Sequence, residues 1–380
     1  MNFELTPEQR ELVQRARNFA EEEFPPLAKE CDRDEKFPIS LWKKAAKLGF
    51  MGIYIDKQYG GLGLGLLGHA MVVEEFWRVD PGLGCIHMAT FGAEVIQSAG
   101  TTDQKKRYLP LVSGGEAIMT TAITEPDAGS DIFAGRSFAK KVDQGYLLNG
   151  SKMFISNGSV ADIILVFCIT DEDNPNPYAR HSFLLVDAKS PGFEAEKLTG
   201  KMGIRAANTA ALSFQDVFVS EENLIGEKGN GFRQVMECFN LNRIIAAGQG
   251  VGVAQGALES AISYVKGHKR FGKPLADSQG IQFKVADMAA MVESARCLYR
   301  SAAWGIDNKK QNVKLVSIAK LIAGEIAVKV SGEALQLHGR SGWTDEHDIE
   351  RFYRAAKIVE IYEGTKEIEK ITIAREVLGR

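Results

Sequence analysis

The chain has 380 residues, of which 45% are hydrophobic and 25% charged, and its formal net charge is −3. This composition describes a soluble globular protein of two or three packed units, and it excludes the large basic surface that binds nucleic acid. The N-terminus has no basic region followed by an apolar one, and no apolar run is long enough for a membrane span, so we expect a cytoplasmic protein.

The cysteines and histidines do not have the spacing of metal ligands. The five cysteines include no CxxC pair, and the six histidines include no HxxxH or HExxH pair. We therefore predict neither a disulfide framework nor a metal site.

The N-terminal part of the sequence predicts helices. Thr6, Pro7 and Glu8 are typical of a helix start, and the helix is expected to run to about Cys31. Further helices are expected at 41–48, 66–78, 82–100 and 103–108, the last of them ending at Pro110. The glycine-rich residues 59–65 lack the GxGxxG spacing of a phosphate-binding loop and are interpreted as an ordinary loop. Residues 1–115 therefore form a predicted N-terminal α-helical domain.

The pattern changes to strands from Ile118. Strands are expected at 120–124, 145–150, 163–169, 183–186 and 212–219. Because no helical segments separate them, the sheet should be largely antiparallel. Residues 116–228 are thus a predicted middle β domain.

The rest of the chain predicts long helices. They are expected at 232–267, 279–307, 311–337, 347–358 and 365–378. The first helix contains Gly248, Gly250, Gly252 and Gly256, which lower helix propensity and should mark close helix crossings. Residues 229–380 are therefore a predicted C-terminal helical bundle, and the fold class is α+β, with an N-terminal helical domain, an antiparallel β domain and a helical bundle.

One acidic residue near the C-terminus is a candidate general base. Glu363 lies beside the apolar Ile358, Val359 and Ile361, and Gly364 separates it from a predicted helix. The positive end of that helix dipole would face the same place, which suits a developing anion. The alternative is a solvated glutamate before an amphipathic helix, which is the commoner situation.

Two stretches of the β domain could contact a cofactor. Residues 124–131 combine hydroxyls, glycine and proline, so backbone N–H groups could approach an anion or a ring edge. Residues 152–158 place Phe154 beside Ser156, which would suit stacking on a planar cofactor. Taken alone, the two stretches could equally be a turn and a surface hairpin.

Together with residues 269–273, 336–339 and 361–365, in this order along an α/β/α chain, these stretches closely resemble the acyl-CoA dehydrogenase family. The resemblance covers essentially the whole chain. It implies a homotetramer, arranged as a dimer of dimers, with one FAD per subunit. It further implies α,β-dehydrogenation of an acyl-CoA to a 2-enoyl-CoA, with electrons passed to an electron-transferring flavoprotein. By similarity, Glu363 removes the α-proton while the β-hydride passes to the flavin, and the backbone N–H of Glu363 helps to bind the thioester carbonyl.

The resemblance also assigns binding residues. Those matching FAD-binding positions are Ile123, Thr124, Gly129, Ser130, Phe154, Ser156, His268, Phe271, Gln336, Gly339, Thr365 and Glu367. Those matching substrate-binding positions are Ser130, Arg243, Tyr362, Met88 and Phe91.

The sequence departs from the family pattern at several positions. His268 stands where an arginine is usual, Asn240 stands where an acid is common, and Ala355 stands where an aspartate is common. These departures put single ligand contacts in doubt. Some relatives carry the base just before the arginine that matches Arg243, but Asn242 cannot serve as a base, which strengthens the assignment to Glu363.

The acyl pocket gives a partial indication of the substrate. Gly84 stands where glutaryl-CoA enzymes place an arginine, so a dicarboxylic substrate is disfavoured. Met88 and Phe91 could shorten the pocket, which favours short, medium, branched or cyclic acyl chains. Alternatively, both side chains pack into the helical core.

Other functions remain open at this level. The same resemblance fits an acyl-CoA oxidase whose flavin is reoxidised by O₂, or a relative that carries out desulfination or nitroalkane oxidation. The alternative from a different class is a non-catalytic scaffold that binds CoA.

Overall fold

The computed structural model describes residues 5–379, and its N-terminal part is helical. The longer helices there are α1 (Pro7–Glu23), α2 (Pro25–Arg33), α3 (Ile39–Lys47), α4 (Gly65–Val79) and α7 (Thr102–Ser113). Thr6 caps α1, because its side chain accepts from the Gln9 backbone while the Gln9 side chain bonds back to the Thr6 backbone. Four phenylalanines from α1, α4 and the segments around them form the centre of this part, with neighbouring ring centroids 5.4–5.9 Å apart.

Three predictions for this part of the chain were wrong. The helix expected to run to about Cys31 is two helices, α1 and α2, because Pro25 and Pro26 interrupt it after Phe24. The single helix expected at 82–100 is three short pieces, α5 (Pro81–Gly84), a 3-10 turn (Cys85–Ala89) and α6 (Ala93–Ala99). The break falls at Gly92, whose φ of 104° lies in the left-handed region and whose N–H bonds the Glu94 side chain. Helix α7 also continues past Pro110 to Ser113, because burial of Leu109 and Val112 holds its last turn.

The middle of the chain forms one seven-stranded sheet. Its strands are β1 (Met119–Ala122), β2 (Phe138–Val142), β3 (Gly145–Ser156), β4 (Ile163–Ile169), β5 (His181–Asp187), β6 (Phe193–Lys197) and β7 (Thr209–Ser220). The order is β1-β4-β2-β3-β7-β6, with β5 paired to β4. The expected antiparallel arrangement is confirmed for most pairs, but β4 pairs in parallel with β1 and β2. Strands β2 and β6 were not predicted, because their mostly exposed, charged residues hide the apolar alternation.

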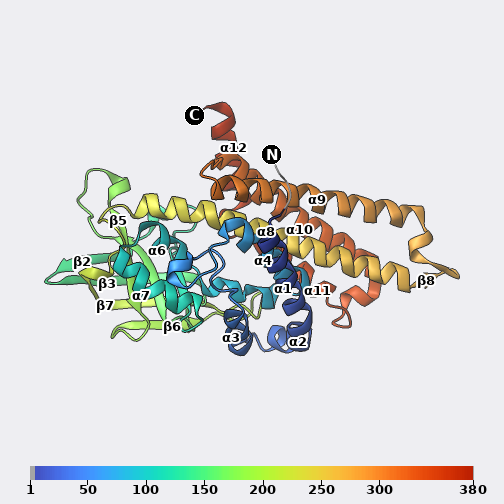
Figure 1. Ribbon diagram of the computed structural model, residues 1–380, viewed down its shortest axis with the longest axis horizontal. Coiled ribbons are helices and arrows are strands. Elements are labelled where there is room, and N and C mark those ends of the chain that lie inside the picture. Colours follow the sequence, from blue (N-terminus) through green and yellow to red (C-terminus); the bar gives the residue numbers. More distant parts are fainter. Residues whose placement is uncertain (1–4, 380) are drawn as a thin grey trace.

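The C-terminal part is a bundle of long helices. These are α8 (Gly231–Gly267), α9 (Gln279–Asp307), α10 (Val313–His338), α11 (Ile349–Val359) and α12 (Lys366–Leu378). Helix α8 runs from the sheet to the opposite end of the molecule, where β8 (Lys269–Arg270) and β9 (Lys273–Pro274) form a small hairpin (Figure 1). The close crossings expected at its glycines are confirmed: a Cβ at Gly250 would lie 2.6 Å from the Ala323 carbonyl oxygen.

The predicted α, β, α order is therefore confirmed, and α8 connects its parts. Helix α8 packs against α4 of the N-terminal part as well as α10 of the bundle. Within residues 5–379 no helix combines the length and apolarity needed to cross a membrane. No group of three or more His, Cys, Asp or Glu side chains in the same range could hold a metal ion.

Candidate active site

Glu363 lies in the short connector between α11 and α12. Its φ is 52° and that of Gly364 is 94°, so two consecutive residues adopt the left-handed conformation, which is strained for glutamate. Thr365 then caps α12 by accepting from the Ile368 N–H at 3.3 Å. This turn directs the carboxyl group of Glu363 inward, and its Oε2 is buried with no hydrogen-bond partner among the described residues.

The surroundings of Glu363 favour a base that titrates near neutrality. Burial raises the pKa of Glu363 to about 7, and the nearby carboxyl of Glu94 adds to the effect. Lys320, Arg243 and Asn242 act in the opposite direction. A carboxyl with a pKa near the working pH is suited to general acid–base catalysis, because both protonation states are accessible.

Two cationic side chains, Lys320 and Arg243, stabilise the connector between α11 and α12. The Lys320 ammonium donates to the Gly364 carbonyl oxygen, and burial lowers the pKa of this lysine to about 8. The Arg243 guanidinium donates to Glu369 Oε1 at 2.8 Å and to Asn240 Oδ1 at 3.0 Å. Glu369 is fully buried, so the position of Arg243 is set by two side chains.

A chain of polar side chains connects Glu363 to α6. The Cys238 thiol donates to Glu94 Oε1 at 3.3 Å, and the Asn242 amide donates to Cys238 Sγ at 3.4 Å and faces Glu363. Burial raises the pKa of Glu94. Sequence reasoning missed Glu94, although a single carboxylate between Ala93 and the apolar Val95 and Ile96 was a signal of a buried acid.

Tyr362 is held in a second chain of hydrogen bonds. Its hydroxyl donates to Gln249 Oε1, and Gln249 Nε2 donates to His87 Nε2 at 3.1 Å. His87 Nδ1 in turn donates to the Gly84 carbonyl oxygen at 2.7 Å. Burial lowers the pKa of His87 to about 4, so this ring is neutral at pH 7 and its Nε2 can accept.

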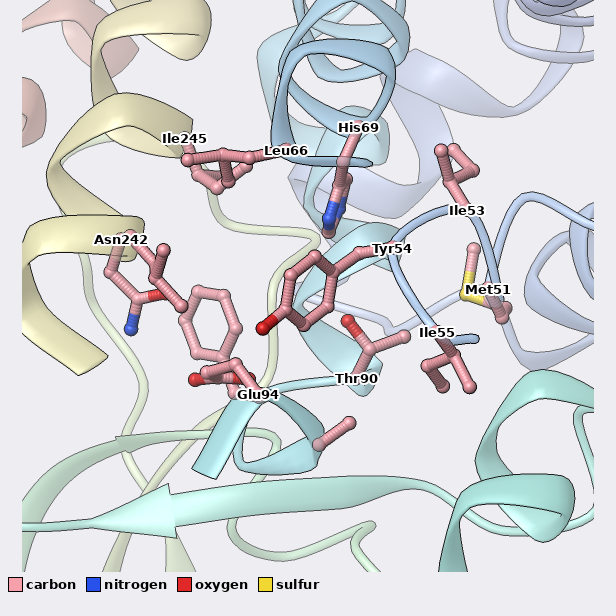
Figure 2. A pocket seen from close by; sticks show the side chains of 13 residues that line it. Met51, Ile53, Tyr54, Ile55, Leu66, His69, Thr90, Glu94, Asn242 and Ile245 are labelled. Carbon is pink, nitrogen blue, oxygen red and sulfur yellow. The ribbon is translucent and has the colours of Figure 1, made fainter. Parts of the chain in front are cut away.

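A cavity of about 30 Å³ lies beside this centre (Figure 2). Its lining comprises Met51, Ile53, Tyr54, Ile55, Leu66, His69, Thr90, Phe91, Ala93, Glu94, Leu241, Asn242 and Ile245. Phe91 therefore contributes to the cavity wall. Met88 is not part of the lining and packs into the hydrophobic core.

The residues that resemble a cofactor site in the β domain lie together at one end of β3. The Met153 N–H donates to the Thr124 carbonyl oxygen at 2.9 Å, which joins the 124–131 loop to the strand. Phe154 is 69% exposed and has a φ of 59°. Ile123, Thr124 and Ser156 are half-buried, whereas Gly129 and Ser130 are exposed. An exposed aromatic ring on a strained backbone indicates a contact surface.

Glu125 and Lys152 anchor this loop from the inside. Lys152 Nζ lies 2.7 Å from Glu125 Oε1 and also donates to the Ile123 carbonyl oxygen at 3.0 Å. The Glu125 carboxylate accepts from the N–H groups of Arg136 and Ser137, at 2.6 and 3.0 Å.

The remaining candidates lie along the C-terminal bundle, some of them beside Glu363 and others far from it. Thr365 and Glu367 stand at the start of α12, where Thr365 is the cap and Glu367 is exposed. Gln336 and Gly339 are exposed at the end of α10. His268 stacks on Tyr264 with centroids 3.7 Å apart, at the end of the bundle that carries the β8–β9 hairpin.

The tip of that hairpin is Phe271, whose φ is 50° and whose side chain is fully exposed. The hairpin lies at the opposite end of the molecule from the sheet (Figure 1). Phe271 therefore cannot reach the Phe154 region of its own chain.

Comparisons with known proteins agree with this organisation. The family models for the N-terminal, middle and C-terminal domains of acyl-CoA dehydrogenase match residues 6–116, 120–217 and 229–378. The acryloyl-CoA reductase (NADH) of Anaerotignum propionicum is 41% identical over 385 residues, which cover 100% of this chain and 97% of that protein.

Two solved structures have nearly the same fold. Butyryl-CoA dehydrogenase from Megasphaera elsdenii is 36% identical with a TM-score of 0.96, and the match covers both chains completely. A chain from a structure on the electron transferring flavoprotein of Acidaminococcus fermentans is also 36% identical, with a TM-score of 0.97 and complete coverage of both chains. The chain described here belongs to the acyl-CoA dehydrogenase family, FAD-dependent oxidoreductases that act on the CH–CH bond of acyl-CoA thioesters.

Proposed function

We propose that this protein oxidises a short acyl-CoA at its α,β bond, with Glu363 as the base, and passes the electrons to an electron-transferring flavoprotein. The observation that carries the proposal is the carboxyl of Glu363, which is held inward by a left-handed turn, has a pKa near 7 and has an unpartnered Oε2. The similarity to butyryl-CoA dehydrogenase supports a short acyl chain, and the similarity to the A. fermentans chain supports the electron acceptor.

The residues around Glu363 supply what proton abstraction needs. The α-proton of a thioester is a weak acid, so the carbonyl must be polarised as negative charge develops on it. The backbone N–H of Glu363 makes no hydrogen bond to the described part of the chain, which leaves it available to a thioester carbonyl. Substrate binding expels water from the centre, which keeps the affinity of Glu363 for the proton high.

The β-domain surface fits the FAD of the family. Phe154 offers an exposed ring, and a Cβ placed on Gly129 would have no atom within 4 Å, so a flat ring system and a chain of phosphates could approach. Ile123, Thr124, Ser130 and Ser156 would bind the ring edge and the phosphates. When bound, the flavin accepts the β-hydride of the substrate.

The other cofactor residues support an assembly of several subunits. Phe271, Gln336 and Gly339 would reach the FAD of a neighbouring subunit in a homotetramer, a dimer of dimers, because Phe271 has no cover in its own chain. His268 would lie beside them. Thr365 and Glu367 would stand near the adenosine half of the cofactor. Arg243 and Ser130 would bind the CoA part of the substrate, and Tyr362 would adjoin the thioester.

The size and charge of the acyl pocket support a short monocarboxylic chain. The cavity has a volume of about 30 Å³, and Phe91 forms part of its wall. Gly84 provides no cation for a distal carboxylate.

We also propose domain boundaries after residues 115 and 228, at the changes from helix to strand and from strand to helix.

The test is anaerobic bleaching of the flavin. The purified protein should be yellow, and butyryl-CoA should bleach it. Glu363→Gln should remain yellow but bleach at least about 100-fold more slowly, because general base catalysis contributes about that factor or more. Glu376→Gln, on the exposed side of α12, is the matched control and should bleach normally.

Three outcomes would contradict the proposal. A colourless protein that does not bind FAD would favour a scaffold that binds CoA. Normal bleaching of Glu363→Gln would place the base elsewhere. Rapid return of colour in air, without added electron-transferring flavoprotein, would favour an oxidase.

Reduction of a 2-enoyl-CoA is a second candidate. It is favoured by the 41% identity to an acryloyl-CoA reductase and by the pKa of Glu363, since a carboxyl with a pKa near 7 is partly protonated at neutral pH and can return a proton to the α-carbon. Adding acryloyl-CoA to the photoreduced protein should then restore the yellow colour. Reduced protein that stays colourless would exclude this direction.

A further inference from the structure

The cavity beside Glu363 contains polar groups that take no direct part in the proton or hydride transfer. Tyr54, His69, Thr90 and Glu94 line it together with apolar side chains (Figure 2). An alkyl tail gains nothing from these groups, and covering a polar group without bonding it costs free energy. A plain hydrocarbon tail can pack on the apolar part of the lining, but it leaves these polar groups without a partner.

Glu94 is a buried acceptor with spare capacity. It is 8% exposed and accepts from the Gly92 N–H at 3.0 Å and from the Cys238 thiol at 3.3 Å, while its own N–H and the Asn242 amide also favour the ionised carboxylate. No lysine, arginine or histidine is among the groups that act on its carboxyl. A carboxylate offers about four acceptor positions, and the two bonds from Gly92 and Cys238 leave capacity for a donor brought by a ligand.

His69 provides a second unused group on the same cavity. Its Nε2 is buried and has no hydrogen-bond partner among the described residues. Burial lowers the pKa of His69 to about 3, so the ring is neutral and one of its nitrogens is an acceptor. The hydroxyl of Tyr54 points into the same space, towards Glu94 and Asn242 (Figure 2).

The size of the cavity limits which part of a substrate could contact Tyr54, His69 and Glu94. A volume of about 30 Å³ holds roughly two water-sized groups. Asn242 faces both Glu363 and the cavity, so the cavity adjoins the base, and under the function proposed above an acyl chain that continues past C2 and C3 would enter it. It would therefore hold the fourth carbon of the acyl chain and one atom attached to it.

We propose that the preferred substrate is a short acyl-CoA whose fourth carbon carries a hydrogen-bond donor, a hydroxyl or an ammonium group, which Glu94 and His69 bind. This inference rests on the function proposed above. The substituent takes no part in the reaction: the bonds that break are still the C2–H and C3–H bonds, and Glu94 and His69 determine specificity.

Three thioesters with equal numbers of heavy atoms test the proposal: pentanoyl-CoA, 4-hydroxybutyryl-CoA and 4-aminobutyryl-CoA. In anaerobic bleaching of the flavin-loaded protein, kcat/KM for the hydroxy or the amino substrate should exceed that for pentanoyl-CoA at least about tenfold, which one good hydrogen bond supplies. Glu94→Leu should reverse this preference. The same substitution at the exposed Glu116 is the control and should leave the ratio unchanged.

Glu94→Gln distinguishes the two kinds of donor. An amide still accepts from a hydroxyl but does not pair with an ammonium group, so a preference for the amino substrate should disappear and one for the hydroxy substrate should persist. His69→Phe should lower the preference for either substrate severalfold. The ratio of dissociation constants, measured by calorimetry on Glu363→Gln, should change in the same direction without turnover.

The outcomes separate this inference from the function on which it rests. If pentanoyl-CoA bleaches wild-type protein as well as both polar substrates, the inference is wrong and the dehydrogenase proposal stands. If no acyl-CoA bleaches the protein, the dehydrogenase proposal itself fails. If Glu94→Leu does not retain its flavin, Glu94→Gln and His69→Phe decide, and unchanged ratios in both variants would overturn the role of this cavity.

Discussion

Two buried glutamates of this protein have opposite chemistry. Burial alone would raise the pKa of Glu125, but Lys152 at 2.7 Å and the N–H groups of residues 136 and 137 outweigh it and lower that pKa. At Glu363, burial and the neighbouring Glu94 raise the pKa to about 7, because no ion pair or full set of donors opposes them. The difference lies in the partners and not in the residue, so Glu125 stabilises a loop while Glu363 remains free to exchange a proton.

The largest change in stability should come from removing the partner of Glu125. Lys152→Met leaves the buried Glu125 carboxylate without its cation, which should lower the free energy of unfolding by about 3–5 kcal/mol. Urea unfolding followed by circular dichroism measures this change. Loosening of the 124–131 loop should also weaken flavin binding.

The double variant Glu125→Leu/Lys152→Met is the control for this prediction. It removes both charges together, so it should be more stable than Lys152→Met alone. Equal stability of the wild type and Lys152→Met would show that the pair does not hold the loop.

The next largest effect should be a shift in the pKa of Glu363. Glu94→Gln removes an acidic neighbour that raises the pKa of Glu363, so that pKa should fall. The base is active when ionised, and the acidic limb of bleaching rate against pH, expected near pH 7, should move to lower pH. The rate at pH 6 should rise severalfold relative to the rate at pH 8. An acidic limb that stays in place would show that Glu94 is not coupled to the base.

Lys320→Met should shift the acidic limb of bleaching rate against pH to higher pH. The ammonium group favours the ionised form of Glu363, so its removal should raise the pKa of the base and slow bleaching below pH 8. The same pH series measures it. A shift to lower pH would contradict the assigned sign of this interaction.

The smallest effect is expected for a residue outside both sites. Met88→Leu conserves volume in the core, so it should cost less than about 1.5 kcal/mol and leave the acyl-chain preference unchanged. Phe91→Leu, in the cavity wall, should instead increase the rate with longer chains. A changed chain preference in Met88→Leu would show that Met88 also reaches the substrate.

The sequence was sufficient to predict most of the fold. Long apolar periodicity predicted α8 to α12, and Gly364 next to a helix start marked the turn that carries Glu363. Strands β2 and β6 were missed because exposed charged residues leave little alternation. The parallel pairing of β4 with β1 was missed because it joins segments that are separated by the β2–β3 hairpin.

The candidate site was harder to predict than the fold. Tyr54, His69, Glu94 and Asn242 meet in one cavity, although they come from four distant segments. Of the four, Asn242 alone adjoins a residue that the sequence singled out, Arg243, and periodicity carries no information about contacts between elements. The neighbours that set the pKa of Glu363 therefore became visible only in three dimensions.

Because Gly364 has no side chain, the connector that carries Glu363 can pack closely against the carboxylate that binds Arg243. A Cβ at this position would lie 2.1 Å from Glu369 Oε1, the same oxygen that accepts from Arg243 Nε. Glu369 Oε1 thus limits how closely the backbone at Gly364 can approach α12, and it also fixes the position of the Arg243 guanidinium. A larger residue at Gly364 would therefore press on Glu369 and displace the guanidinium of Arg243 as well as the carboxyl of Glu363.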